Sequence, residues 1–344
     1  MSFPHSLYRG RAPGDTNQPM ESARIVIEGA GGPEVLRLVS WQIPELAADR
    51  VLVRVTHAGV SFGDVLLRRG VFRDRPKPAV PGYDVVGVVE ASRAPGVAVG
   101  QRVAAFIEYG GHARHAIVHA RDIVPLTEDV AGAEAAAVIL NYPTAARMLE
   151  LAGAARGDTV LVHGIRGGVG SAVNELGRRQ GLRVLGTGRT HAPHEGVFAP
   201  SHPDFERALR EAAPDGLAAV FDSSAEDLRR SHRLVRRGGA LVVFGLSAAA
   251  QPGWRARLKF LRGLAQIAWA KLLPRGRRTQ ISAIDQLYRR EPERVRVLVA
   301  EQLELLARGE IRPELGAILP LERAAEAHRL LEAGKVRGKI VLTA

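Results

Sequence analysis

The first third of the chain carries short apolar runs separated by glycine and proline. In several of these runs apolar and polar positions alternate, which is the two-residue period of a strand with one buried face. The runs lie at residues 23–29, 51–60, 83–91, 102–107 and 112–119. This pattern predicts a compact, mostly antiparallel β domain between about residues 23 and 130.

The pattern changes near residue 141, where continuous apolar runs begin to alternate with helical stretches. Strands are expected at 159–164, 183–188, 218–222 and 240–245, and helices at 168–180, 204–213 and 227–236. Strands that are apolar at almost every position are typical of a parallel sheet that helices cover on both faces. A long helix at about 292–308, a shorter one at 322–333 and a strand at 339–344 complete the predicted elements.

Composition places the chain among ordinary globular proteins, with 46% hydrophobic and 24% charged residues in 344. No window holds the roughly 18 uncharged apolar residues that a membrane-spanning helix needs. The first 21 residues show no periodicity and lack the apolar core of a secretory signal, so we expect a flexible tail on a cytoplasmic protein. The absence of cysteine excludes disulfides, thiolate zinc sites and a cysteine nucleophile.

Positive charge is concentrated in one segment. The chain has a net charge of +12, and residues 251–284 contain eight Lys or Arg and no Asp or Glu. Such a segment suits nucleic acid or an anionic membrane, or it is a solvated helix face beside an anionic ligand, which we favour. Because no nucleic-acid recognition motif accompanies the charge, we expect no nucleic-acid partner.

The strongest chemical signal is the glycine-rich segment at residues 164–170, which follows an apolar strand directly and opens a predicted helix. Glycine lets the backbone turn sharply and approach a pyrophosphate, and a helix N-terminus offers unpaired N–H groups. The spacing is Gly-x-x-Gly-x-x-Gly, a variant of the common Gly-x-Gly-x-x-Gly, and the alternative interpretation is a plain turn. With both flanking strands and the helix in place, we predict a dinucleotide site at Gly164, Gly167, Gly168 and Gly170.

The end of the second strand of this unit indicates which dinucleotide binds. A NAD site usually has an acid about 20 residues beyond the loop, on the ribose 2′-hydroxyl. Residues 186–190 contain no acid but carry Arg189, with His191 and His194 close in sequence. A guanidinium favours a 2′-phosphate. The expected cofactor is therefore NADPH, unless Arg189 is one of the many surface arginines.

Several segments, in their order and spacing, resemble the medium-chain dehydrogenase/reductase superfamily and, within it, the zinc-free quinone oxidoreductase (zeta-crystallin-like) branch. They are residues 59–64, 68–70, 81–87, 141–145, 164–170, 244–247, 320–321 and 338–342. The resemblance implies an α/β fold with a GroES-like β-rich domain and a Rossmann domain with a doubly wound parallel sheet. The implied parts are a tail at 1–21, the GroES-like domain at 22–141 and 286–344, and the NADPH-binding domain at 142–285, with a basic amphipathic insert at about 253–278.

The same resemblance implies a set of NADPH contacts. They are Thr144, Gly167, Gly168, Val169, Arg189, Phe244, Gly245, Leu246 and Lys339. Branches with catalytic zinc use Cys and His where this chain has Ser61 and Tyr83, so we expect no metal site. The implied reaction is hydride transfer to a quinone or to the β-carbon of an activated alkene.

The chain departs from the family pattern at three places in this site. The family usually has Asn where Ser61 stands and Tyr where Phe72 stands. The helix that usually follows the second strand and bears a cofactor lysine is almost missing after Arg189.

Reduction also needs a proton for the oxyanion or carbanion that forms. Ser61 and Tyr142 carry candidate hydroxyl donors, and Asp64 is placed to orient Ser61. The alternatives are a turn-capping role for Asp64 and packing of Tyr142 at the domain hinge. The histidines show no spacing that would gather three metal ligands.

Residues 254–273 place apolar side chains at helical spacing, with Lys and Arg on the other side. Three roles are open for this stretch. It packs on the Rossmann core or at a dimer contact, it covers an apolar substrate as a lid, or it lies on a membrane surface with Trp254 and Trp269 as anchors.

Together these features predict a zinc-independent, NADPH-dependent oxidoreductase that transfers hydride to a quinone or an α,β-unsaturated carbonyl, a small hydrophobic substrate. The resemblance also implies a homodimer. One alternative is an enoyl reductase or tailoring enzyme of secondary metabolism. The other is a non-catalytic nucleotide-binding protein that acts on membranes or partners.

Overall fold

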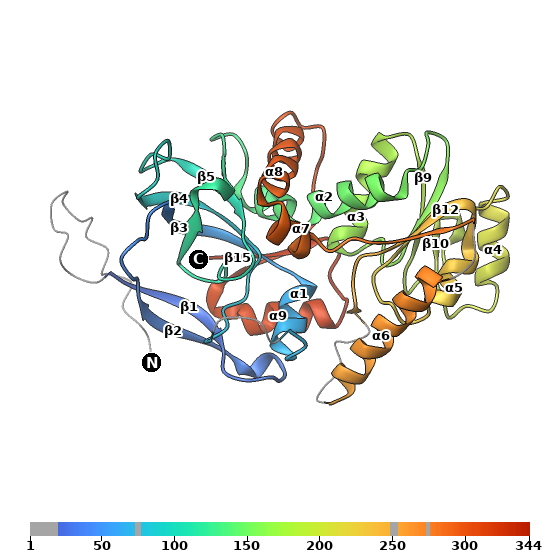
Figure 1. Ribbon diagram of the computed structural model, residues 1–344, viewed down its shortest axis with the longest axis horizontal. Helices are drawn as coiled ribbons and strands as arrows, with labels where there is room; N and C mark the ends of the chain where they lie inside the picture. Colours follow the sequence, from blue (N-terminus) through green and yellow to red (C-terminus); the bar gives the residue numbers. More distant parts are fainter. Residues whose placement is uncertain (1–19, 73–76, 248–253, 273–275) are drawn as a thin grey trace.

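The computed structural model describes residues 20–72, 77–247, 254–272 and 276–344, and the description includes no side chains for 254–257 and 271–272. Within these residues two large sheets lie at opposite ends of an elongated molecule (Figure 1). A mixed, mainly antiparallel sheet has the order β14-β15-β3-β4-β5-β7, with β6 beside β3, and a parallel sheet has the order β10-β9-β8-β11-β12-β13. The predicted α/β fold class, a β-rich part with a doubly wound parallel sheet, is confirmed.

The mixed sheet joins strands from both ends of the chain. The last strand, β15, lies antiparallel to β3, so that Ile340 pairs with Val60. Alternate valines of β3 pack with those of β4 and β5 in one apolar cluster. The strands of this sheet are β3 (Arg50–Val60), β4 (Asp84–Ser92), β5 (Arg102–Phe106), β6 (His115–His119), β7 (Ile123–Pro125), β14 (Leu315–Pro320) and β15 (Lys339–Thr343). A separate ribbon consists of β1 (Glu21–Ile27) and β2 (Leu36–Gln42).

The parallel sheet is buried on both faces, as continuous apolar strands require. All six residues of β11 are buried, including Asp222 at its end. The strand order reverses at β8, and ligands of open α/β sheets bind outside the carboxyl ends of the strands at such a point. The strands are β8 (Thr159–Val162), β9 (Arg183–Thr187), β10 (Val197–Phe198), β11 (Leu217–Asp222), β12 (Val235–Val243) and β13 (Arg278–Ile281).

The helices connect and cover the two sheets (Figure 1). They are α1 (Phe62–Arg68), α2 (Gly132–Ala152), α3 (Gly168–Arg179), α4 (Phe205–Ala212), α5 (Leu228–Leu234), α6 (Trp254–Leu272), α7 (Ile284–Arg290), α8 (Pro292–Ala307) and α9 (Ala324–Glu332). Short 3₁₀ turns lie at Pro33–Val35, Ala120–Asp122, Pro193–Glu195 and Leu321–Arg323.

Helix α2 was not predicted from the sequence, although it lies at the centre of the molecule. It is apolar on nearly every side and carries Pro143 in its interior, and both properties conceal a helix from periodicity arguments. It packs in one cluster with β8 and β12 of the parallel sheet and with Val86 and Val341 of the mixed sheet. The boundary predicted between residues 141 and 142 falls inside this unbroken helix and stays a prediction.

The segment after β9 is short, as the sequence predicted. In place of a full helix, the chain forms the turn Pro193–Glu195 and enters β10 at Val197.

The start of β15 connects the two halves through Gly338 and Lys339. The amide of Gly338 donates to the carbonyl of Arg166, 2.9 Å away, in the glycine-rich loop. The ammonium of Lys339 lies 3.2 Å from Oδ2 of Asp84, and both side chains are buried. The other oxygen of Asp84 accepts from the amide of Gly59. A buried ion pair therefore fixes the C-terminal strand beside the start of β4.

We expect Lys339→Met to lower the free energy of unfolding by about 3–5 kcal/mol, because it leaves the carboxylate of Asp84 buried without its partner. Urea denaturation measures this loss. Adding Asp84→Asn, which removes the stranded charge, should recover part of it, whereas Lys335→Met, at an exposed lysine of the same segment, should change stability by less than about 0.5 kcal/mol. Equal losses in the single and double variants would contradict this role.

Candidate functional site

The glycine-rich loop forms a tight turn between β8 and α3. Gly164 has a left-handed backbone with φ of 73°, which favours glycine. A Cβ on Gly170 would lie 2.1 Å from the carbonyl oxygen of Gly164, so the first turn of α3 packs directly on the loop backbone. The loop therefore depends on glycine at both positions.

The N-terminus of α3 is suited to an anion. Its N-cap is Gly167, which offers no side chain to the free amides, and the first turn contains no acid. The first amides of a helix lack internal partners and carry partial positive charge. Gly167 is exposed, and a Cβ on Gly168 would lie 2.5 Å from Nδ2 of Asn141, so α2 borders the same cradle. These residues fit the diphosphate of a dinucleotide.

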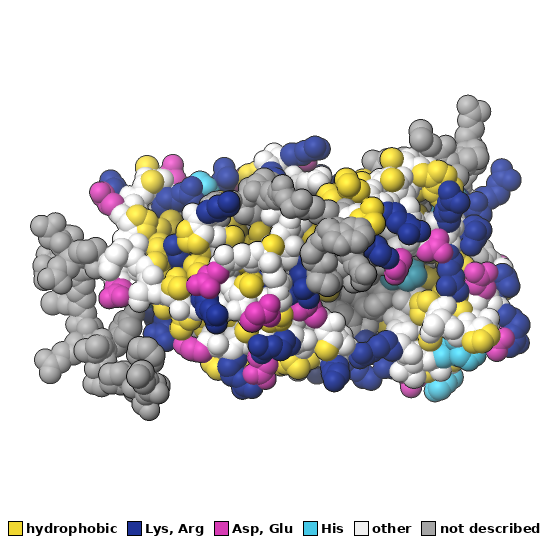
Figure 2. Space-filling view, turned by 90° about the horizontal axis from the view of Figure 1, so that it is seen from below, with side chains coloured by type: hydrophobic (Ala, Val, Ile, Leu, Met, Phe, Trp, Pro, Cys, Tyr) yellow, Lys and Arg dark blue, Asp and Glu magenta, His cyan; other side chains and the backbone are white. Residues whose placement is uncertain are grey.

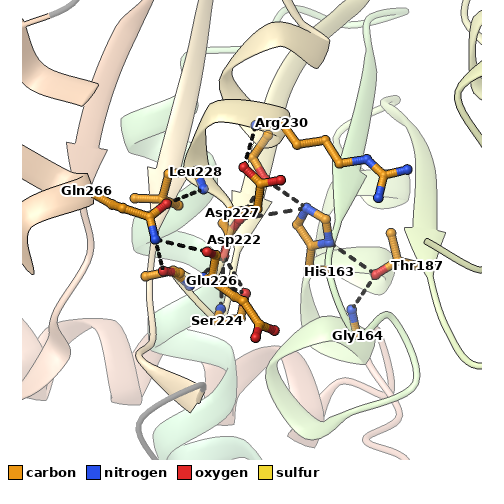
Figure 3. Close-up of polar contacts among 12 residues, drawn as sticks. His163, Gly164, Thr187, Asp222, Ser224, Glu226, Asp227, Leu228, Arg230 and Gln266 are labelled. Atoms are coloured by element: carbon orange, nitrogen blue, oxygen red, sulfur yellow. Dashed lines mark hydrogen bonds and ion pairs between the residues drawn. The ribbon is translucent and has the colours of Figure 1, made fainter. Parts of the chain in front are cut away.

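A buried polar network ties together the carboxyl ends of β8, β9 and β11, where His163 lies between Thr187 and Asp222 (Figure 3). Nδ1 of His163 is 3.2 Å from the hydroxyl of Thr187, which also accepts from the amide of Gly164 at 3.1 Å. Nε2 of His163 is 3.2 Å from the hydroxyl of Ser231, which donates to Oδ2 of Asp222 at 2.6 Å. The network fixes the strand ends that support the loop.

The pKa values of Asp222 and His163 are both lowered in this network. Burial acts to raise the pKa of Asp222, but the charged form of His163, followed by hydrogen bonds from the hydroxyl of Ser231 and the amides of Ala225 and Ser224, lowers it more, so the pKa lies below its usual range. Burial lowers the pKa of His163 and outweighs the opposite effect of Asp222. Asp222 is therefore committed to internal hydrogen bonds, and its role is to hold the loop after β11.

Arg189 lies at the end of β9, as predicted, but its guanidinium is engaged. Its two terminal nitrogens donate to the carbonyls of Ala333 and Gly334, at the end of α9. His191 turns away toward His202, and their rings stack at 3.9 Å between centroids. Arg189 thus links the end of β9 to the end of α9, and it would have to release or share these carbonyls to meet a 2′-phosphate.

The remaining predicted cofactor residues occupy different surroundings. Thr144 donates to the carbonyl of Leu140 within α2, 2.6 Å away. The amide of Phe244 donates to the carbonyl of Asp222, so residues 244–246 run beside the end of β11. Lys339 is fully committed to Asp84, close to the loop but not open to it.

Ser61 and Asp64 are brought together at the start of α1. Oδ2 of Asp64 accepts from both the amide and the hydroxyl of Ser61, each at 2.8 Å, and the Ser61 hydroxyl accepts from the Asp64 amide. Oδ1 of Asp64 accepts from the amide of Gly82 at 2.7 Å. This is a capping box that also fixes the segment before β4. The hydroxyl proton of Ser61 points to a carboxylate, which makes it a poor proton donor to substrate.

The hydroxyl of Tyr142 does not contact Ser61 or Asp64. Its hydroxyl donates to Glu175 of α3, and Glu175 also accepts from the amide of Arg312 at 2.8 Å. Burial, followed by the hydrogen bond to Glu175, raises the pKa of Tyr142. The structure supports the packing alternative, in which Tyr142 joins α2 to α3.

Tyr83 is a hydroxyl residue beside Ser61 that the sequence analysis did not propose as a donor. A Cβ on Gly63 would lie 2.9 Å from the hydroxyl oxygen of Tyr83, so this phenol fills the space that a side chain at position 63 would take. Gly63 and Phe62 are partly exposed, whereas Tyr83 is buried. The sequence signals that could have indicated this contact were glycine at position 63, within the Ser61–Asp64 segment, and tyrosine at position 83, two positions after Pro81.

A second polar cluster lies between α1 and α9, next to Asp64, and is buried except at Glu332. Arg68, one turn after Asp64 on α1, approaches Oε1 of Glu332 on α9 at 2.7 Å. His328, one turn before Glu332, is fully buried. Among the described residues no hydrogen-bond partner exists for either ring nitrogen of His328, for Nδ1 of His112 or for Nε of Arg68. Burial lowers the pKa of His328 to about 3, opposed by Asp64 and reinforced by His112 and Arg68.

Within the described part of the chain, no group of three or more His, Cys, Asp or Glu is placed to hold a metal ion. No helix of that part has the length and apolarity needed to cross a bilayer.

Comparison with known proteins agrees with this geometry. A family model for the alcohol dehydrogenase GroES-like domain matches residues 47–128, and one for zinc-binding dehydrogenases matches residues 197–342. The quinone oxidoreductase of Sus scrofa is 30% identical over 354 residues, which cover 95% of this chain and 99% of that protein. The chain belongs to the medium-chain dehydrogenase/reductase superfamily, in its zinc-free quinone oxidoreductase branch.

Two further relatives of this superfamily member bear on its chemistry. A mycobacterial protein solved as a complex with NADPH is 27% identical, with a TM-score of 0.79 over 94% of this chain and 100% of that chain. The polyketide synthase system protein NorB of Streptomyces orinoci is 32% identical over 354 residues, which are 98% of this chain but 15% of that protein.

Sequence reasoning did not single out the residues of the strand-end network, His163, Thr187, Asp222 and Ser231. His163, Thr187 and Asp222 lie in the last two positions of the predicted strands 159–164, 183–188 and 218–222, and the carboxyl ends of such strands meet at one edge. Polar residues at the ends of β8, β9 and β11 were therefore the available signal.

His328 gives this protein a specific acid sensitivity. Its pKa is near 6.5 when unfolded and about 3 when folded, so unfolding takes up a proton and stability falls as pH drops below about 6.5. Between pH 7 and pH 5 this group alone should cost about 2 kcal/mol. We expect the free energy of unfolding of His328→Leu, measured by urea denaturation at pH 7 and pH 5, to decrease by about 2 kcal/mol less than that of the native protein. The same acid dependence in both proteins would contradict the assignment.

Proposed function

We propose that this protein is an NADPH-dependent reductase of quinones or α,β-unsaturated carbonyl compounds. One observation carries the proposal: the chain of contacts between the loop and Ser61. Gly338 bridges to Gly167 of the loop, and two residues later Ile340 pairs with Val60, which precedes Ser61. A short segment thus connects the anion cradle to the hydroxyl-bearing start of α1.

The residues that would hold the cofactor follow from the cradle. The amides at Gly168 and Val169 would receive the diphosphate, and Arg189 would receive the 2′-phosphate after leaving the carbonyls of α9. The segment 244–246, beside the end of β11, would border the nicotinamide. Bound nicotinamide supplies the hydride, that is, one hydrogen with two electrons.

The proton comes from the start of α1 and β4. When hydride reaches the substrate, negative charge develops on its oxygen, and a hydroxyl close to that oxygen stabilises it and transfers a proton. The hydroxyl of Ser61 is directed to Asp64, and the hydroxyl of Tyr83 lies beside Gly63 at the start of α1. We assign the donor role to Tyr83 and a positioning role to Ser61 and Asp64, which fix the segment before Tyr83 through Gly82.

A second candidate is reduction of an enoyl thioester in secondary metabolism, because the chain matches a segment of a polyketide synthase along almost its whole length. The two candidates share the hydride and proton chemistry and differ in the acceptor. A non-catalytic nucleotide-binding role is the third candidate. It would be indicated by a protein that binds NADPH but does not oxidise it with any acceptor.

A homodimer and a cytoplasmic location belong to the same proposal. The strand β13 is the edge of the parallel sheet in the described structure, and Ile281 on it is exposed, which suits pairing with a second copy.

We expect the protein to oxidise NADPH in the presence of a simple quinone, and Arg189→Gln to weaken NADPH binding about tenfold or more while NADH binding stays the same. The loss is selective because only NADPH carries the phosphate that the guanidinium contacts. Fluorescence titration with both cofactors measures affinity, and NADPH absorbance measures turnover.

Three outcomes would count against this assignment. Equal losses for the two cofactors would mean that Arg189 only joins the halves of the protein. Turnover with an enoyl thioester but not with a quinone would favour the second candidate, and binding without turnover would favour the third.

We expect Tyr83→Phe to lower kcat by about 10² or more with cofactor affinity unchanged, because it removes one hydroxyl and keeps the ring. A second measurement does not depend on turnover. It uses the α,β-unsaturated aldehyde 4-(dimethylamino)cinnamaldehyde, whose absorbance band moves to longer wavelength when its carbonyl accepts a hydrogen bond. The native protein should shift the band, and the variant should not. The matched control is Tyr288→Phe, which removes a hydroxyl bound to Asp122. Equal shifts in all three proteins would exclude Tyr83 as the donor.

A further inference from the structure

Helix α6 is attached to the parallel-sheet half by a face that includes Gln266, Ile267 and Ala270. Nε2 of Gln266 donates to the carbonyl of Glu226 at 2.9 Å, and its Oε1 accepts from the amide of Leu228 at 2.9 Å (Figure 3). Ile267 and Ala270 are buried on the same side. The attachment therefore runs along α5 and the loop before it.

The opposite face of α6 is apolar and exposed. Leu258, Leu261 and Leu264 have 55%, 62% and 43% of their surface accessible, and Ala265 and Ala268 are exposed as well. With 3.6 residues per turn these positions form one continuous arc. A helix on a globular protein normally turns its apolar arc to the core, whereas the leucine-rich arc of α6 faces solvent. We call this solvent-facing arc the inverted face of α6.

Basic residues belong to the same helix as this apolar arc. By helical register Arg262, which is exposed, falls along one border of the arc. Lys259 lies on the attached side and pairs with Glu226 at 3.1 Å. The sequence of α6 also contains Arg255, Arg257 and Lys271, and residues 251–284 contain no acid that would neutralise this charge. In Figure 2 hydrophobic and basic side chains lie next to one another on the parallel-sheet half.

We propose that this inverted face of α6 docks the protein on an anionic lipid bilayer. The apolar arc enters the boundary between headgroups and acyl chains, and the positive charge of α6 meets lipid phosphates and carboxylates. This inference is independent of the proposed reaction.

The other occupants fit the same face less well. A second copy of α6 would bring a like-charged segment against this one, and close like charges cost several kcal/mol. A lid over substrate would turn its leucines inward, whereas Leu258 and Leu261 are more than half exposed. A bilayer supplies the apolar depth and the negative charge together.

Membrane binding is tested by sedimenting the full-length protein with phosphatidylcholine vesicles, with and without phosphatidylserine. We expect binding to the serine-containing vesicles, weakened by salt because headgroup charge contributes. The triple variant Leu258→Ser, Leu261→Ser, Leu264→Ser should bind at least about tenfold more weakly. Arg262→Gln should reduce binding to the anionic vesicles only.

A matched control separates docking from general surface hydrophobicity. The variant Leu38→Ser, Val297→Ser, Ile318→Ser changes three other exposed apolar residues and should bind like the native protein. NADPH titration and the thermal unfolding midpoint should agree among all variants, which shows that they are folded and keeps this result separate from the proposed reductase activity.

Several results would overturn the proposal. One is that the native protein binds neither kind of vesicle. Another is that the native protein and the α6 triple variant bind equally. A third is that Arg262→Gln weakens vesicle binding while the α6 triple variant does not, which would indicate adsorption to the membrane surface without insertion. A protein dimer that the α6 triple variant abolishes would assign the face to a second copy instead.

Discussion

The placement of the glycine-rich loop relative to the mixed sheet depends on two consecutive residues at the start of the last strand. Gly338 contacts the carbonyl of Arg166 in the cofactor loop, and Lys339 pairs with buried Asp84 beneath the start of α1. A Cβ on Gly338 would lie 1.9 Å from the carbonyl of Glu314, and its φ is 72°, so only glycine permits the crossing. Because the chain continues into β15, the N-terminal sheet, the C-terminal strand and the anion cradle are fixed relative to one another.

Two carboxylates near this crossing serve to hold the backbone in place. Asp64 and Asp222 are buried and saturated by hydrogen bonds to neighbouring amides and hydroxyls. Such carboxylates hold loops in place and do not take part in proton transfer. The proposed chemistry is assigned instead to backbone amides at the start of α3 and to the phenol beside Gly63. This division suits a reaction in which the cofactor carries the electrons and the protein supplies position and one proton.

The sequence predicted the parallel strands, the glycine-rich loop and the short connection after Arg189, because each has a local signature. It did not predict α2, whose apolar surface and Pro143 lack one, nor the environments of Tyr142 and Lys339. Tyr142 contacts Glu175 and Lys339 pairs with Asp84, 255 positions away, and residue order does not reveal such pairings. The partners of Arg189 could not be predicted either, because they are backbone carbonyls after α9, more than 140 positions away in the sequence.

Helix α6 packs against the segment that would border the nicotinamide. A Cβ on Gly263 would lie 2.9 Å from Cδ2 of Leu246, so the helix backbone lies close to this leucine side chain. A tilt of α6 would therefore be transmitted to residues 244–246 through Leu246. If lipid holds the helix, an oily acceptor dissolved in the same leaflet reaches this part of the protein by diffusion in two dimensions, from the phase in which such molecules are most concentrated.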